Sequence, residues 1–161
     1  MGLPAAEAAL LGADDAVRVR TFRLLLVLAQ QLRTLMDQRL RGDGLTTQQA
    51  ALITVVDALG APKLSEVAAG MGTTHQNAKQ VAAVLERKGF VVIEPDPRDR
   101  RVRRVRTTEL SRAHWGARSA DDQRYVLEWF ADLSAEQART LFDLLLVVRK
   151  RASDGVRSED R

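Results

Sequence analysis

The chain contains no cysteine among its 161 residues. It can therefore form no disulfide bond, offer no thiolate to a metal ion and carry no cysteine-based redox sensor. The only histidines are His75 and His114, and they lack the spacing of a paired metal site. The sequence predicts neither a bound metal nor a cofactor.

Features of catalysis and of membrane insertion are also missing. The carboxylates are dispersed and no nucleophile stands in an elbow or a phosphate-binding loop, so we do not expect an enzyme.

The apolar run 24–29 is far too short to span a bilayer, and residues 1–13 lack the basic N-terminal region of a secretory signal. We expect a soluble, cytoplasmic protein with no membrane partner.

Positive charge is concentrated in one segment. Residues 98–106 hold six arginines and one aspartate, a formal charge of +5, whereas the whole chain carries only +4. Clustered arginines gain affinity for a polyanion by releasing its counterions. This favours a nucleic acid as partner, although an anionic membrane surface would satisfy the same electrostatics.

The sequence up to Gly89 predicts four helices. Residues 14–40 contain neither proline nor glycine and repeat apolar side chains at helical spacing. Thr46 and Gln49 form a capping box for a second helix that ends near Gly60. Ser65 is expected to cap a short third helix over 66–69. Thr73 or Thr74 caps a fourth, which stops at Gly89.

A hairpin is predicted to follow the fourth helix. Residues 91–93 and 102–106 have the composition of strands, and the segment 95–100 between them is rich in proline and aspartate. Two short helices joined by a glycine turn and followed by a hairpin form a helix-turn-helix with a wing.

The last third predicts two more helices, separated by a capping box of Ser134 and Gln137. Residues 141–148 carry more apolar positions than one intramolecular face needs, which indicates a dimer interface. An ordinary core helix is the alternative. Residues 153–161 are polar and are expected to fray.

The fourth helix is predicted to read DNA bases. Its polar stripe suits the major groove, where glutamine and asparagine can bond adenine and lysine can reach guanine or a phosphate. A merely solvated helix face is the alternative. The predicted DNA-binding residues are Thr74, His75, Gln76, Asn77, Lys79 and Gln80.

The wing is predicted to contact DNA through its arginines. A guanidinium at a hairpin tip can enter a narrow minor groove, and Asp99 can hold Arg101 in position by a charge-assisted pair. An arginine-rich strand that discourages edge pairing is the alternative. The predicted contact residues are Arg98, Asp99, Arg100, Arg101 and Arg103.

Residues 45–112 resemble the MarR family of winged-helix transcriptional regulators. The matching text is Leu64–Ala68, Leu85–Val91 and, most specifically, the wing Asp96–Arg101. The resemblance implies a mainly α fold: a winged helix-turn-helix with a two-stranded β wing, flanked by N- and C-terminal dimerisation helices. The expected parts are an N-terminal arm and helix (1–44), the DNA-binding domain (45–110), dimerisation helices (111–152) and a flexible tail (153–161).

The resemblance also implies a function. A homodimer of this kind binds palindromic double-stranded DNA, with half-sites about 10 bp apart, and is expected to act as a repressor released by a small aromatic or phenolic ligand. Thr107 and Ser111 depart from the family pattern, so the joint after the wing is expected to differ. The open alternatives are a DNA-coating architectural protein and a winged helix that grips an acidic protein.

Overall fold

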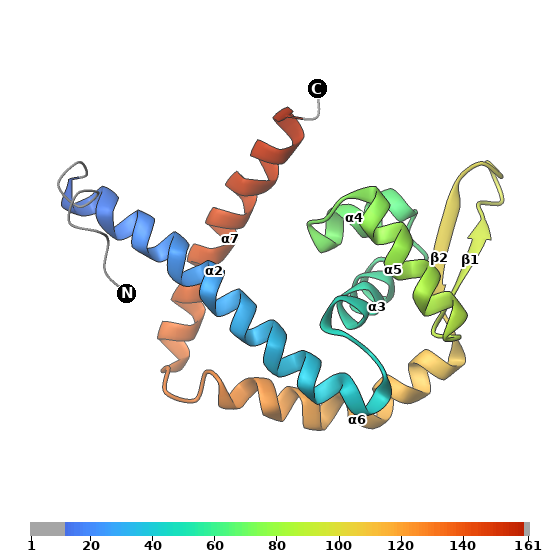
Figure 1. Ribbon diagram of the computed structural model, residues 1–161, viewed down its shortest axis with the longest axis horizontal. Helices are drawn as coiled ribbons and strands as arrows, with labels where there is room; N and C mark the ends of the chain where they lie inside the picture. The colour runs from blue at the N-terminus through green and yellow to red at the C-terminus, as the bar shows by residue number, and fades with distance from the viewer. Residues whose placement is uncertain (1–11, 160–161) are drawn as a thin grey trace. The chain divides into compact units, whose positions relative to one another are not determined.

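The computed structural model describes residues 12–159, whose elements are labelled from α2 onward in Figure 1. The chain divides into two compact units, residues 1–51 and residues 52–161. Within residues 12–159, no helix is both long enough and apolar enough to cross a membrane.

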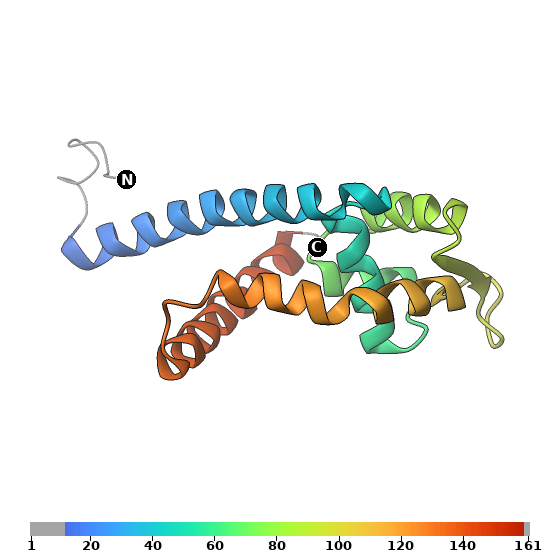
Figure 2. The ribbon, with the colours of Figure 1, turned by 90° about the horizontal axis from the view of Figure 1, so that it is seen from below.

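The first unit consists of one long helix and the start of the next. Helix α2 covers Ala13–Leu40 without a break, as its proline- and glycine-free sequence predicts, and Figure 2 shows its full length. A 3₁₀ turn, η1 (Arg41–Asp43), ends at Gly44, whose φ of 65° suits glycine. Thr46 and Gln49 form the predicted capping box, each backbone N–H lying 3.3 Å from the other's side-chain oxygen.

Asp37 fixes the start of helix α3 (Thr47–Leu59) against α2. Its carboxylate accepts hydrogen bonds from the backbone N–H of Thr47 at 2.6 Å and from the Thr47 hydroxyl at 2.7 Å. These two bonds, the backbone one first, lower the pKa of Asp37 because they stabilise its charged form.

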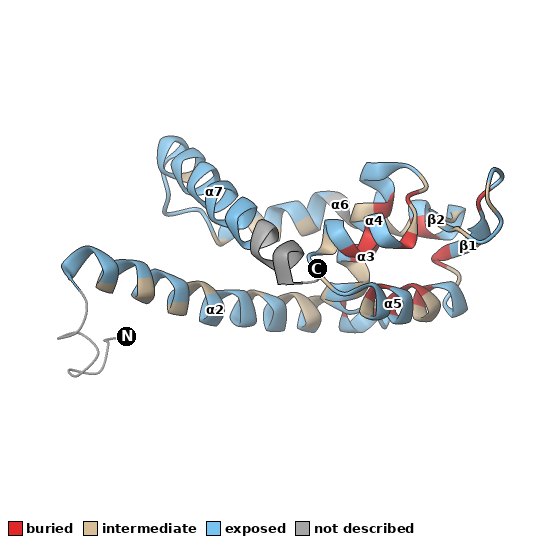
Figure 3. Ribbon diagram, turned by 90° about the horizontal axis from the view of Figure 1, so that it is seen from above, coloured by how far each residue is buried: buried red, intermediate tan, exposed pale blue. Residues whose placement is uncertain are grey.

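The second unit contains the winged helix. Helices α4 (Leu64–Met71) and α5 (His75–Arg87) are followed by strands β1 (Val91–Pro95) and β2 (Arg103–Thr107), which pair antiparallel with Val91 opposite Thr107. Buried residues concentrate on α3, α4, α5 and the hairpin (Figure 3). The largest fully buried apolar side chains of this core are Leu52, Ile53, Val56, Val67, Leu85, Val91 and Val105.

The predicted boundaries of the third helix and of both strands of the hairpin were wrong. Helix α4 begins at Leu64 rather than after Ser65, because the Glu66 carboxylate accepts a 2.7 Å hydrogen bond from the Lys63 backbone and fixes Lys63 as the N-cap. The β ladder extends to Pro95 opposite Arg103, two positions beyond the predicted end of the first strand. A 2.8 Å bond from Asp96 N–H to the Val102 carbonyl then closes the loop.

The C-terminal third forms helices α6 (Glu109–Glu128) and α7 (Ala135–Glu159). Ser134 and Gln137 make the predicted capping box before α7, with hydrogen bonds of 2.8 and 3.2 Å. The backbone of α7 remains helical over residues 153–159, where the sequence predicts a flexible tail. A regular helix needs only backbone hydrogen bonds, so a polar sequence can continue it.

Candidate nucleic-acid interface

Both ends of helix α5 are fixed by a glycine in the left-handed conformation and a local hydrogen bond. Gly72, with φ 61°, ends α4 in the left-handed conformation, and Thr74 begins α5 by accepting a 3.2 Å bond from the Asn77 backbone. At the other end Gly89, with φ 78°, lets the Phe90 N–H bond the Leu85 carbonyl at 2.9 Å. The buried face consists of Ala78, Val81, Ala82 and Leu85.

The opposite face of α5 carries most of the predicted base-reading residues. His75, Gln76, Lys79 and Gln80 are all exposed. Asn77 is only half-buried rather than fully exposed, and its side-chain amide donates a 2.8 Å hydrogen bond to the Thr73 hydroxyl. The four exposed side chains therefore form the polar stripe, while Asn77 and the capping Thr74 hold the start of the helix.

The tip of the wing holds one arginine in a fixed orientation. Asp99 accepts a 3.0 Å bond from the Arg101 backbone and a 3.2 Å bond from the Arg101 Nε. The side chain of Arg101 is nevertheless 90% exposed. The predicted pairing of Asp99 with Arg101 is thus confirmed, and it orients the guanidinium outward.

The other arginines of the wing fall into two groups. Arg104 pairs with Asp96, and Arg106 lies 3.6 Å from a Glu94 oxygen. Within the part of the chain that the structure describes, three further arginines are exposed and have no acidic partner. These are Arg98, Arg100 and Arg103, all of them predicted contact residues.

Asp96 and Arg104 organise the wing. The sequence places Asp96 in the segment that resembles the MarR family, but it predicts a structural role for neither residue. Asp96 is buried, and it accepts a 2.7 Å hydrogen bond from the Arg98 backbone and another from Arg104 Nε. The Arg98 bond, followed by the Arg104 bond, lowers the pKa of Asp96. In a run of six arginines, no sequence signal separates Arg104 from its neighbours.

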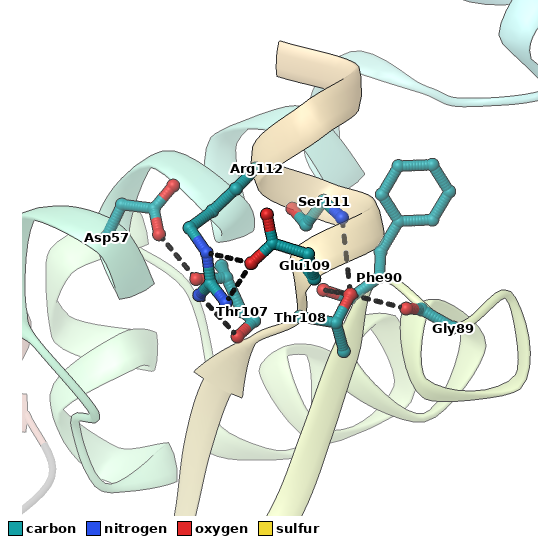
Figure 4. Close-up of polar contacts among 8 residues, drawn as sticks. All are labelled: Asp57, Gly89, Phe90, Thr107, Thr108, Glu109, Ser111 and Arg112. Atoms are coloured by element: carbon teal, nitrogen blue, oxygen red, sulfur yellow. Dashed lines mark hydrogen bonds and ion pairs between the residues drawn. The ribbon is translucent and has the colours of Figure 1, made fainter. Parts of the chain in front are cut away.

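The wing joins α6 through a network of polar contacts, drawn in Figure 4. The Thr107 hydroxyl donates to Asp57 on α3 at 2.7 Å, and Arg112 on α6 donates to the Thr107 carbonyl at 3.2 Å. The Thr108 hydroxyl donates to the Gly89 carbonyl at 2.6 Å. The end of the wing is thereby tied to α3, to the residue that stops α5, and to α6.

Ser111 completes this joint from the first turn of α6. Its backbone N–H bonds the Thr108 hydroxyl at 3.2 Å, so Thr108 caps the helix. The Ser111 side chain is fully buried, and its hydroxyl has no hydrogen-bond partner among the described residues. A glycine there would remove the hydroxyl without loss of a hydrogen bond within that part of the chain.

The sequence of the chain is similar to those of known proteins. The MarR family model matches residues 43–102. The transcriptional activatory protein BadR of Rhodopseudomonas palustris is 32% identical over 150 residues, which cover 87% of this chain and 84% of BadR. The chain belongs to the MarR family. It is a DNA-binding transcriptional regulator and not an enzyme.

Solved structures of MarR proteins have the same fold. A MarR protein from Peptoclostridium difficile superimposes with a TM-score of 0.78 at 16% identity, covering 84% of this chain and 88% of that one. An E. coli MarR variant complexed with operator DNA gives a TM-score of 0.74 at 21% identity, covering 81% and 94%. The mainly α winged helix with a two-stranded wing is therefore the MarR fold.

Proposed function

We propose that this MarR-family regulator is a cytoplasmic homodimer that recognises a palindromic operator. The exposed stripe of α5 reads bases in the major groove, and the wing places Arg101 in the minor groove. Two neighbouring surfaces support the proposal: the exposed polar stripe of α5, and the hairpin that follows it. On the hairpin, Arg98, Arg100 and Arg103 are exposed and lack acidic partners among the described residues.

Exposed apolar side chains on α7 support the homodimer. Phe142, Leu144 and Val147 are each 60% or more exposed in the single chain. Large apolar side chains on several faces of one helix are unfavourable when they are exposed to water. The same helix of a second copy of the chain can bury them. Two-fold symmetry of the dimer then requires a palindromic site, with half-sites about 10 bp apart.

We further propose that the protein acts as a repressor released by a small aromatic or phenolic ligand. Activation is the second candidate, because the relative that is 32% identical is named an activatory protein. Whether the protein represses or activates depends on where its DNA site lies. A dimer that covers a promoter blocks polymerase, whereas a dimer bound upstream can recruit it. Transcription in vitro from a promoter that contains the selected site separates the two roles.

Selection of bound duplexes from a random pool tests the core of the proposal. The purified protein is expected to enrich a palindrome and to sediment as a dimer both alone and on that DNA. Enrichment of no sequence, with equal affinity for all duplexes, would favour an architectural protein. Absence of binding even at low salt would favour a protein partner.

The ligand is tested on the selected duplex. Benzoate and 4-hydroxybenzoate serve as aromatic probes, and cyclohexanecarboxylate is the matched control that keeps the charge and loses the ring. Release by the aromatic acids alone supports an aromatic effector. Release by all three, or by none, contradicts this part of the proposal.

A further inference from the structure

Strand β2 is bonded on both of its edges. One edge pairs with β1, where Arg104 stands opposite Glu94. On the other edge the Val105 N–H donates to the Pro62 carbonyl at 2.9 Å, and Lys63 bridges to Arg104. The base of the wing is thus attached to the turn that joins α3 to α4.

The Arg104 side chain extends this attachment toward the wing tip. Its Nη1 donates to the Ala61 carbonyl at 2.8 Å, and its Nε donates to Asp96. Asp96 in turn accepts the Arg98 backbone N–H at 2.7 Å. A continuous chain of hydrogen bonds therefore runs from the α3–α4 turn to the loop that carries the exposed arginines.

The anchored turn has an unusual backbone. Gly60 and Ala61 both lie in the left-handed region, with φ of 63° and 60°. This conformation is disfavoured for alanine, so the surrounding contacts must hold it. The bond from Arg104 to the Ala61 carbonyl is one such contact, and it links the turn and the wing mechanically.

Burial separates Arg104 from its neighbour on the same face of the strand. The Arg104 and Asp96 side chains are 31% and 7% exposed, whereas Arg106 and Glu94 are 57% and 56% exposed and only 3.6 Å apart. At 3.6 Å the Arg106–Glu94 pair is too long for a hydrogen bond, and an exposed pair without one holds little structure. Arg106 therefore offers a control that carries the same charge on the same strand without the connection to the turn.

The geometry points to Arg104 as a positioning residue for DNA binding: with Asp96 it braces the wing against the α3–α4 turn and so fixes where the exposed arginines lie relative to α5. It does not itself contact DNA. The inference deepens the proposed function and rests on it, because the wing must be held at a set distance from the recognition helix for both to engage one operator.

Footprinting on the duplex selected by the wild-type protein tests this role. Arg104→Met is expected to lose hydroxyl-radical protection in the minor groove flanking each half-site and to keep methylation protection in the major groove. Its affinity should fall about tenfold or more below that of Arg106→Met, which removes only a charge. Arg104→Lys, which can restore one of the two bonds, is expected to recover part of the flanking protection.

Hydrogen exchange on the DNA-free protein provides an independent measurement. In Arg104→Met the amides of Arg98 and Val102 are expected to exchange faster, while those of α5 keep wild-type rates; this also excludes general unfolding. The positioning role of Arg104 would be refuted if the exchange rates at the wing were unchanged in Arg104→Met. Identical footprints for Arg104→Met and Arg106→Met would refute it too. If the wild type selected no duplex, the proposed function would fail, and the exchange rates would still decide whether Arg104 holds the wing.

Discussion

Arg103 offers a quantitative test of how the wing meets the phosphate backbone. It is the first residue of β2, it is exposed, and it has no acidic partner within residues 12–159. If each Arg103 neutralises one phosphate, the variant Arg103→Ala removes two contacts from a dimer. At about 0.9 counterions per phosphate, the magnitude of the negative slope of log K against log salt should fall by about 1.8.

The same arithmetic fixes the loss of affinity. At 0.15 M salt each phosphate contact adds about 0.7 to log K. The loss of two contacts therefore lowers the association constant roughly 30-fold, or about 2 kcal/mol per dimer. Because phosphates carry no sequence information, the loss should be equal on the selected palindrome and on a scrambled duplex. This separates Arg103 from a base-reading residue.

Fluorescence anisotropy titrations at several salt concentrations measure both quantities. The matched control is Arg124→Ala, which removes one exposed arginine from α6, where it pairs with Asp121 at 3.1 Å. That variant should keep the wild-type slope. An unchanged slope for Arg103→Ala, or an equal decrease for Arg124→Ala, would refute the assignment of Arg103 to a phosphate.

Four further changes test other parts of the structure. Gln76→Ala should cost about 1–3 kcal/mol on the selected palindrome and nothing on scrambled DNA; an equal loss on both would exclude base readout. Thr74→Ala should destabilise the fold by about 1 kcal/mol in urea unfolding, and Thr74→Ser should restore most of it. Because hydrogen bonds from Thr47 lower the pKa of Asp37, this group stabilises the fold above its ordinary pKa of about 3.9 and loses that effect as pH falls through the folded value. Urea unfolding at pH 7 and at successively lower pH should therefore show a stability difference between wild type and Asp37→Asn that shrinks as the pH falls, and a constant difference would contradict it. Val147→Glu places a charge on the exposed apolar surface of α7, so sedimentation should show monomers; an intact dimer would place the interface elsewhere.

Residue type and spacing were enough to predict the order of the elements and the capping motifs that begin and end them. The capping boxes of Thr46 and Ser134, the cap at Thr74 and the pairing of Asp99 with Arg101 each join residues two or three positions apart. Contacts this short depend on local backbone geometry, so residue type and spacing suffice to predict them. The resemblance to the MarR family likewise depended on short sequence segments.

Which arginines of the wing face outward depends on contacts between residues that are far apart in the chain. Arg104 bonds Ala61 across 43 positions of sequence, and Thr107 bonds Asp57 across 50. Such pairs form when separate helices and strands pack together, and no periodicity in the segment around either partner encodes them. Six arginines that look equivalent in the sequence therefore divide into one held outward by Asp99, two paired with Asp96 and Glu94, and three without an acidic partner among the described residues.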